Sequence, residues 1–377
     1  MAHRYPSGVT VVDADFTKRL PKIELHAHLT GSITPQCLHE IWTQRKLSEP
    51  DLALEDPLAV LSNDKKWDIV TFFPIFSQYI YELCSTPASI LYSTNAVLQD
   101  FKDDGVVYLE LRTTPRSSAS ISKDDYVASI LDCMKNFAGR AAMPTYLILS
   151  IDRRNTAMQA METVDLAIKY RSRGVVGVDL CGDPSKGDVA IFREAFVKAK
   201  SHDLKIALHF AEISRQGLEL ELGTLLSYQP DRLGHVIHVP ESIKQEIICK
   251  SIGLELCVSC NIQAQMTEGG VAAHHFGFWK ESPCPIALCV SYNDSLPFPL
   301  QKQKLTHHLQ TDDVGIFGST LSNEYLLVAK SFKLNSTDLI RLYERSIAMV
   351  FSGEEEKCRL RNILEEQETK NFASITS

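Results

Sequence analysis

The amino-acid sequence predicts an α/β protein with the (β/α)8, or TIM-barrel, architecture. Eight short runs of β-branched and other apolar residues recur along the chain, and segments with helical spacing lie between them. Most of the runs lack strict polar and apolar alternation, as expected for parallel strands that are covered on both faces. Repeated alternation of strand and helix is typical of this barrel.

The predicted elements follow one another in a regular order. The strand candidates are residues 22–25, 106–111, 146–151, 175–180, 205–210, 232–236, 254–258 and 285–290. The helix candidates between them include residues 87–103, 124–138, 155–172, 188–201 and 240–251. Residues 32–104 form a much longer connection, with Trp42, Trp67 and the cluster Phe72, Phe73 and Phe76. We expect a helical lid after strand 1 there, or a few packing helices beside the barrel, and further helices from Leu334 onward.

Composition limits the function classes. The 377 residues carry a net charge of -8 with no concentration of Lys or Arg, which disfavours a nucleic-acid surface. No apolar run could span a bilayer, and residues 1–15 lack the apolar core of a signal peptide. Ten scattered cysteines, including a lone Cys257–Cys260 pair, indicate reduced and mostly buried thiols. We expect one cytoplasmic, monomeric domain over residues 1–377, with its core at about 20–351.

Polar residues gather where the predicted strands end, which is where barrels of this kind place their active sites. His26 and His28 follow strand 1, and as residues i and i+2 of an extended segment they point to the same side. His209 ends strand 5, and Asp312 follows strand 8. Each feature alone is weak, because a lone H-x-H pair or a histidine in an apolar strand is usually incidental. Together they predict a metal site, and imidazole nitrogens suit zinc.

The chemistry expected of such a site is hydrolytic. A catalytic zinc lowers the pKa of its water from 15.7 to about 7. Glu212 stands three residues after His209, close enough to supply acid–base catalysis without binding the metal. A two-metal amidohydrolase would carry a bridging lysine at the end of strand 4, and residues 175–180 contain none. A single zinc ion per chain is therefore favoured.

Several segments make the sequence similar to the adenosine deaminase superfamily. They are residues 21–29 (PKIELHAHL), 178–183 (VDLCGD), 209–212 (HFAE), 232–235 (RLGH) and 311–313 (TDD). Within the superfamily the chain most resembles the adenosine deaminase-like branch, the N6-methyl-AMP deaminases. That likeness lies in residues 113–116 (TTPR), 150–154 (SIDRR), 182–184 (GDP) and 274–279 (HHFGFW). The resemblance extends over residues 20–351.

The resemblance implies a role for each matching residue. His26, His28, His209 and Asp312 would bind zinc. Glu212 would protonate purine N1 and so make C6 electrophilic, and His235 would orient and deprotonate the attacking water. Asp313 would contact purine N7 and help to hold the hydroxide, and the Gly182 N–H would meet N3. The set of residues implied to bind substrate is His28, Thr30, Tyr81, Thr113, Thr114, Pro115, Arg116, Asp152, Gly182 and Asp313.

Three residues implied to contact the substrate either have two interpretations or depart from the family pattern. Arg116 is either a 5′-phosphate partner, which its forked guanidinium would suit, or a solvated loop arginine. Thr30 stands where the branch typically has asparagine, and Tyr81 stands where a lid histidine is expected. These two departures concern the identity of the substrate and leave the reaction class unchanged.

A larger departure follows strand 8. In the family this strand leads directly into the Asp-Asp pair, whereas here residues 290–310 intervene before Thr311. The insertion contains Pro297, Pro299, His307 and His308 and looks unlike its surroundings. One hypothesis is that it is an intron retained in the gene model. The alternative is a real surface loop, because long insertions are tolerated when the loop ends meet.

Three functions are compatible with the sequence. The first is hydrolysis of N6-methyl-AMP to IMP and methylamine, and the second is deamination of adenosine or adenine with release of ammonia. The third is a catalytically inactive purine-binding protein, which the insertion could have produced. Retention of both Glu212 and His235 argues against the third. A nucleic-acid base deaminase is disfavoured, because its His-x-Glu and paired-cysteine signature is missing.

Overall fold

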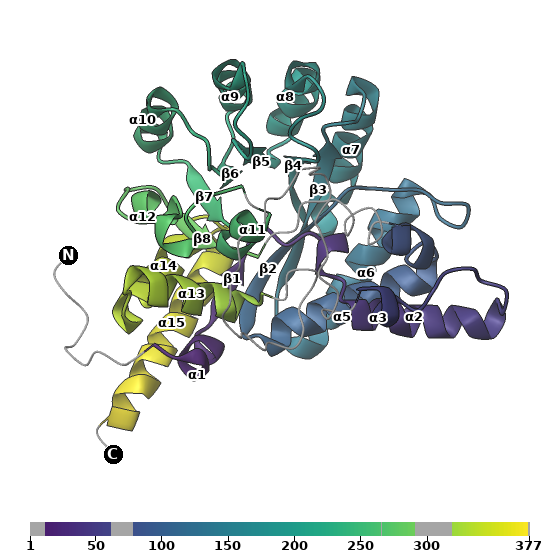
Figure 1. The fold of residues 1–377 in the computed structure, drawn as a ribbon, viewed down its shortest axis with the longest axis horizontal. Helices are drawn as coiled ribbons and strands as arrows, with labels where there is room; N and C mark the ends of the chain where they lie inside the picture. The colour runs from purple at the N-terminus through teal and green to yellow at the C-terminus, as the bar shows by residue number, and fades with distance from the viewer. Residues whose placement is uncertain (1–11, 62–77, 265, 291–318, 376–377) are drawn as a thin grey trace.

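The fold is a barrel of eight parallel strands that follow one another in chain order (Figure 1). The computed structural model describes residues 12–61, 78–264, 266–290 and 319–375. The strands are β1 (Lys22–Glu24), β2 (Val106–Thr113), β3 (Thr145–Asp152), β4 (Val175–Cys181), β5 (Lys205–Phe210), β6 (Arg232–His235), β7 (Gly253–Leu256) and β8 (Ile286–Leu288). Strand β8 contacts β1 and nearly closes the ring. The predicted barrel and its eight strand candidates are confirmed.

Helices cover the outside of the barrel. They are α5 (Pro87–Asp103), α6 (Lys123–Ala141), α7 (Ala157–Tyr170), α8 (Arg193–Ser201), α9 (Leu218–Leu226), α10 (Glu241–Lys250), α13 (Leu321–Phe332) and α14 (Ser336–Ile347). The predicted helix at 188–201 is divided, because Asp188 caps a 3-10 turn (Val189–Phe192) that precedes α8. The short helices α11 (Val258–Gln263) and α12 (Phe276–Trp279) lie between β7 and β8.

Local sequence explains where several of these helices begin. Thr86 and Ser89 form a reciprocal capping box at the start of α5, which satisfies backbone N–H groups that have no partner within the helix. Pro87 follows in the first turn, where its missing N–H costs nothing. Thr156 and Gln159 form the same box at α7. These caps define where the chain leaves the strand ends and enters the covering helices.

Two kinds of core lie on the two sides of the strands. Between strands and helices the core is apolar and includes Leu109, Val178 and Leu208, none of which is exposed. A second set of buried side chains is charged: Glu24, Glu110, Arg112, Asp179, Arg232 and Glu255. Buried charges require partners, and the partners of this set lead directly to the candidate site.

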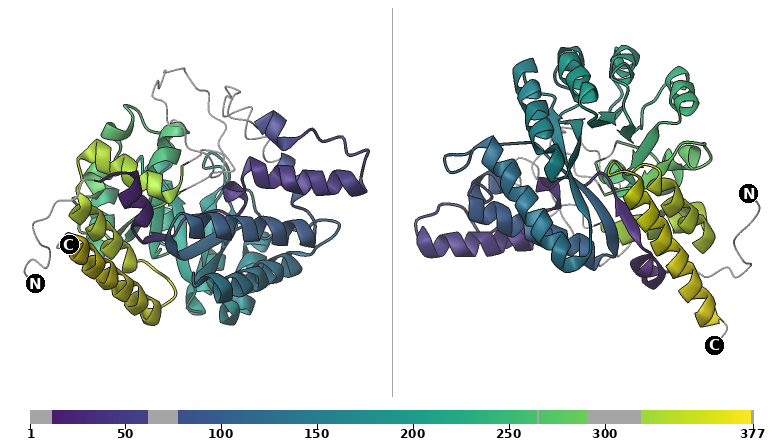
Figure 2. Two further views of the ribbon diagram at one scale, coloured as in Figure 1. Left: turned by 90° about the horizontal axis from the view of Figure 1, so that it is seen from below. Right: turned by 180° about the vertical axis from the view of Figure 1, so that it is seen from behind.

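The long connection after β1 is helical where the structure describes it. Helices α2 (Pro35–Ser48) and α3 (Pro57–Leu61) precede α5, and Trp42 donates a hydrogen bond to the Leu54 carbonyl. The residues Trp67, Phe72, Phe73 and Phe76 lie outside the described residues. Helix α2 extends from one side of the barrel, and α15 (Glu354–Ile375) lies on the opposite side (Figure 2).

The thiols are as the sequence predicts. All ten cysteines are free, and Cys257 and Cys260 are both buried. Within the described ranges, no helix combines the length and the apolar character needed to cross a membrane.

Candidate active site

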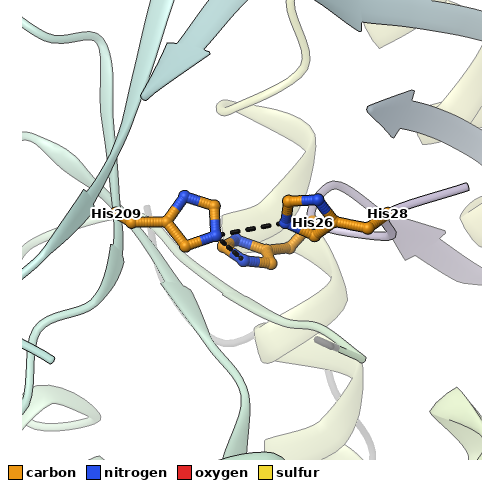
Figure 3. A group of neighbouring side chains, drawn as sticks. All are labelled: His26, His28 and His209. Carbon is orange, nitrogen blue, oxygen red and sulfur yellow. Dashed lines mark hydrogen bonds between the residues drawn. The ribbon is translucent and has the colours of Figure 1, made fainter. Parts of the chain in front are cut away.

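Three imidazoles converge at the carboxyl ends of the strands (Figure 3). His26 and His28 come from the segment that follows β1, and His209 comes from β5. His26 Nε2 and His28 Nε2 each lie 3.1 Å from His209 Nε2. The ligand atoms of these three histidines all lie within 4.8 Å of one another. Among the described residues, no other group of three or more His, Cys, Asp or Glu side chains meets this condition. The structure thus brings together the three histidines that the sequence singled out, and their binding of a metal stays a prediction.

The hydrogen bonds behind the rings decide whether the cluster suits a metal. His26 Nδ1 lies 2.5 Å from Glu255 Oε2, and His209 Nδ1 lies 3.1 Å from Asp179 Oδ1. A carboxylate only accepts, so in each ring the Nδ1 atom carries the proton and the Nε2 lone pair faces the cluster. Lone pairs 3.1 Å apart repel each other unless a cation lies between them.

Zinc fits this donor set. Nitrogen ligands about 2.0–2.1 Å from a tetrahedral zinc lie about 3.3 Å from one another, which agrees with the 3.1 Å separations of the cluster. Neutral imidazoles and free lone pairs are also what metal binding requires.

The surroundings keep most of the cluster neutral. Burial, followed by the charge of Arg112, lowers the pKa of His26 well below its ordinary value. Burial and the neighbouring His209 do the same to the pKa of His28. Burial also acts to lower the pKa of His209, but the Asp179 carboxylate outweighs it and the pKa is raised. The rings of His26 and His28 are therefore neutral at neutral pH, and the Asp179 carboxylate holds the His209 proton on Nδ1, so that the Nε2 lone pair of His209 faces the cluster.

Arg112 joins the two carboxylates that orient the rings. Its Nη2 lies 2.9 Å from Glu255 Oε2 and its Nη1 lies 3.2 Å from Asp179 Oδ1, and all three side chains are fully buried. Burial acts to raise the pKa of Asp179, but the charges of His209 and Arg112 overcome this, and the pKa falls below its ordinary value. Arg112 thus stabilises the charged form of Asp179 and forms an ion pair with Glu255.

Glu212 and His235 complete the polar floor of the site. Glu212 is 2% exposed and His235 is fully buried. His235 Nε2 lies 3.8 Å from Glu212 Oε2, and the His235 ring centroid lies 5.0 Å from that of His26 and 5.2 Å from that of His209. Both residues predicted to act in acid–base catalysis therefore lie beside the cluster of three histidines.

The backbone here takes conformations that few side chains tolerate. His235 and Val236 have φ values of 65° and 49°, in the left-handed region. His275 Nε2 lies 2.6 Å from the His235 carbonyl oxygen, which helps to hold the strained turn. Gly234 is required for another reason, because a Cβ there would lie 2.6 Å from Cε1 of His26. Such strain persists only when surrounding contacts enforce it and is typical of functional sites.

A cavity of about 480 Å³ opens beside Glu212, as defined by the residues that the structure describes. This volume is within the range of small-molecule sites. Its lining includes Glu212, Ile237, His238, Met266 and His275. The site therefore has space for a ligand next to the acid–base pair.

The residues implied to bind substrate lie at neighbouring strand ends. Thr113 ends β2 and Asp152 ends β3, while Gly182 follows β4 with φ +101°. A Cβ at Gly182 would lie 2.8 Å from Asp152 Oδ1, so only glycine fits this close approach. Asp152 also accepts two hydrogen bonds from the Arg154 guanidinium. The barrel thus brings these predicted residues to one edge, close to the carboxyl ends of the strands.

Arg116 lies in an aromatic setting. Its guanidinium carbon is 5.6 Å from the Tyr81 ring centroid and 5.3 Å from that of Tyr126. Nη2 donates to the Cys84 carbonyl at 2.9 Å, whereas the buried Nη1 has no hydrogen-bond partner among the described residues. Arg116 is thus a half-buried loop arginine that packs against two aromatic rings, and its Nη1 has no acceptor among the described residues.

Of the remaining residues predicted to bind substrate or metal, the structure describes some and not others. Thr114 and Pro115 follow Thr113 directly, and Thr30 begins a 3-10 turn (Thr30–Ser32) just after His28. Asp312 and Asp313, together with nearly all of the 290–310 insertion, lie outside the described residues. Their assigned roles therefore stay predictions.

Sequence reasoning did not find the residues behind the ligands. Arg112 and Glu255 are charged residues within otherwise apolar strands, and that contrast was the available signal. Asn261 lies on α11, 2.8 Å from His235 Nδ1, and nothing in its local sequence marks it. These partners become visible only when the barrel brings separate strands together.

The chain is similar in sequence to a known protein family and to several characterised deaminases. The profile of the Adenosine deaminase family matches residues 21–289. The N6-Methyl-AMP deaminase of Homo sapiens is 35% identical over 363 residues, which is 92% of this chain and 93% of that protein. The N6-mAMP deaminase of Arabidopsis thaliana is 32% identical over 375 residues, 93% and 98% of the two chains.

Solved structures agree with the sequence matches. A crystal structure of Arabidopsis ADAL complexed with IMP aligns with a TM-score of 0.80 at 31% identity, covering 94% of this chain and 99% of that one. A Burkholderia amidohydrolase with bound Zn shares the fold, with a TM-score of 0.78 at 18% identity. The resemblance inferred from the motifs is therefore confirmed, and this chain belongs to the adenosine deaminase family of metal-dependent hydrolytic deaminases.

Proposed function

We propose that this chain binds one zinc ion and hydrolyses the C6–N bond of an adenine nucleotide, with N6-methyl-AMP converted to IMP and methylamine. The observation that carries the proposal is the cluster of His26, His28 and His209, with Glu212 and His235 beside it. The relatives named N6-methyl-AMP deaminase support this substrate, as does the Arabidopsis homologue solved with IMP.

The proposed roles follow from where each side chain lies. His26, His28 and His209 would hold zinc, and Asp312 would be the fourth ligand. When bound, zinc supplies a water molecule acidic enough to act as a nucleophile at neutral pH. Glu212, almost fully buried, would protonate purine N1. His235 would hold the attacking oxygen, and Asp313 would contact purine N7.

The ring and sugar would be held by groups at the ends of β2, β3 and β4. The backbone N–H of Gly182 would meet purine N3, since no side chain blocks its approach. His28, Thr30, Thr113, Thr114, Pro115 and Asp152 would surround the sugar. We also propose that residues 32–104 cover the site as a lid, on a single catalytic domain of residues 1–377 with its core at about 20–351.

Arg116 would bind the 5′-phosphate, with Tyr81 beside it. The two tyrosine rings hold the guanidinium in place, so little side-chain freedom is lost on binding. The buried Nη1 still lacks an acceptor within the described part of the chain, and a phosphate oxygen would provide one. A nucleotide would then be preferred over a nucleoside.

A substrate panel tests this proposal. Purified, zinc-loaded protein is incubated with N6-methyl-AMP, AMP, N6-methyladenosine, adenosine and adenine, and the deaminated products and released amines are quantified. We expect the highest kcat/KM for N6-methyl-AMP. We also expect Arg116→Met to raise KM for nucleotides about 10–100-fold without changing nucleoside kinetics, while the exposed-site control Arg173→Met changes neither. Preference for unphosphorylated adenosine would overturn the nucleotide assignment, and turnover of none of the five would overturn the proposed function.

A further inference from the structure

A row of buried hydrogen-bonding side chains lies behind His235. Asn261 Oδ1 is placed 2.8 Å from His235 Nδ1, and Asn261 Nδ2 is placed 3.1 Å from His274 Nε2. His235 and Asn261 are fully buried, and His274 is 2% exposed. Water therefore does not supply alternative partners, and the protons of the row must satisfy one another.

The far end of the row is set by the backbone. The N–H of Phe276 donates to His274 Nδ1 at 3.0 Å, and a backbone N–H can only donate. Burial lowers the pKa of His274 to about 2, so the ring is neutral at physiological pH and carries a single proton. Because Nδ1 accepts, that proton is on Nε2.

The protonated Nε2 of His274 then decides which way the Asn261 amide faces. An amide has one accepting and one donating end, and the two ends are distinguished by their partners. With Nδ2 toward His274, that ring would have to accept hydrogen bonds at both nitrogens, which a neutral imidazole cannot do. The bonds are satisfied when Oδ1 accepts from His274 and Nδ2 donates to His235 Nδ1.

We propose that His274 and Asn261 are positioning residues that fix the proton of His235 on Nε2, directed into the active site. The proposal rests on the proposed function and deepens it. His235 Nε2 is buried, has no hydrogen-bond partner among the described residues and lies 3.8 Å from Glu212 Oε2. In this tautomer His235 would donate a hydrogen bond toward the attacking oxygen. The proton of the attacking water would leave to solvent before the attack, because bound zinc would lower the pKa of that water to about 7. The proposal keeps the orienting role that the family resemblance implies for His235 and differs from it on the deprotonating role, which the following experiments test.

The row also gives a purpose to the HHFGFW segment. His274 is the last ring of the row, and the Phe276 N–H donates a hydrogen bond to it. His275 contacts the His235 carbonyl oxygen. Three successive residues therefore act on the proton, the backbone and the orientation of His235.

The tautomer is measured directly by NMR on the full-length, zinc-loaded protein labelled with 15N at its histidines. Long-range 1H–15N correlations distinguish protonated from unprotonated ring nitrogens, and the His235→Gln variant assigns the His235 signals. We expect His235 to show an unprotonated Nδ1 and a protonated Nε2. A wild-type His235 with its proton on Nδ1 would overturn the proposal, whether or not any substrate is turned over.

Asn261→Asp supplies a second, independent test. A carboxylate only accepts, so it would take the proton of His274 Nε2 and also require a proton on His235 Nδ1. We expect the Nδ1 signal of His235 to change from unprotonated to protonated in this variant. If Asn261 already accepted from His235 Nδ1, the substitution would leave that signal protonated throughout, which would contradict the proposal.

His274→Gln and His274→Leu form a matched pair. Glutamine keeps an N–H donor for Asn261, whereas leucine does not. We expect the leucine variant to lose kcat on the order of 10²–10⁴-fold, as a mis-set imidazole tautomer does elsewhere, with KM nearly unchanged. The glutamine variant should retain the His235 tautomer and most of kcat. If both variants lost the same share of kcat while thermal unfolding and the His235 NMR signals stayed unchanged, His274 would not act through Asn261 on His235, and the proposal would be contradicted.

Discussion

Replacing Arg112 by leucine would leave two buried carboxylates without the cation that they share. The guanidinium lies 2.9 Å from Glu255 Oε2 and 3.2 Å from Asp179 Oδ1, and none of these side chains is exposed. Leucine fills part of the space but returns no charge. The carboxylates then stay buried and uncompensated, or they take up protons and no longer orient His26 and His209.

The size of the effect follows from the burial. Removing one partner of a buried ion pair costs about 3–5 kcal/mol, because the remaining charge has lost its compensation. At 1.36 kcal/mol per factor of ten, the folding equilibrium falls by about 10²–10⁴. Loss of the residues that orient metal ligands typically weakens metal binding about 10–100-fold. Arg112→Leu should therefore lower both the free energy of unfolding and the zinc affinity.

Urea unfolding of the zinc-loaded protein and competition with a chelator measure the two quantities separately. Arg173→Leu is the matched control, because Arg173 pairs with Asp132 at 2.7 Å where both side chains are substantially exposed. We expect the control to change stability by less than about 1 kcal/mol. A loss below about 1 kcal/mol in Arg112→Leu, with zinc affinity unchanged, would refute the reasoning.

Three further predictions concern single positions. Gly234→Ala should weaken zinc binding at least tenfold by chelator competition, because the new Cβ would lie 2.6 Å from Cε1 of His26. Glu212→Gln should lower kcat about 10²–10⁴-fold in the deaminase assay, with zinc content unchanged, because the ring nitrogen loses its proton donor. Burial lowers the pKa of Lys22 to about 8. Between pH 8 and 10.5 the free energy of unfolding of the wild-type protein should therefore rise relative to that of the Lys22→Met variant, by up to about 3 kcal/mol.

The sign of the Lys22 prediction follows from proton counts. Between pH 8 and 10.5 the unfolded chain keeps the Lys22 proton that the folded chain has released, so raising the pH favours folding. A flat difference between Lys22→Met and wild type over this interval would contradict it.

Controls are available for the other two predictions. Gly223→Ala on α9 is the control for Gly234, because a Cβ there meets nothing within 4 Å. Unchanged zinc affinity in Gly234→Ala would show that the His26 ring can move without loss. A Glu212→Gln variant with normal kcat would assign the proton transfer to another group.

The sequence was informative about the barrel because each strand and each cap is encoded locally. The run that forms β5 was predicted at its observed bounds, and α5 begins at its Thr86 capping box. The ligand cluster could also be predicted, because carboxyl ends of parallel strands meet at one end of a barrel. His26, His28 and His209 needed only their positions relative to the strands.

The supporting contacts depend on geometry that local sequence does not contain. Arg112 and Glu255 are 143 residues apart in the chain, and they meet because β2 and β7 belong to the same barrel and both side chains are buried within it. The proton of His235 depends on Asn261, from α11, and on a backbone N–H beyond His274. Such links follow from the register and closure of the whole sheet and not from any motif.

Zinc content is the most direct test of the central claim. The wild-type protein and a His209→Ala variant are purified in parallel, dialysed against metal-free buffer and measured by inductively coupled plasma mass spectrometry. We expect about one zinc per wild-type chain and a loss of most of it in the variant, because His209 lies 3.1 Å from both other imidazoles. A wild-type protein that holds no zinc after incubation with the ion, or a variant that binds zinc as tightly as wild type, would contradict the account.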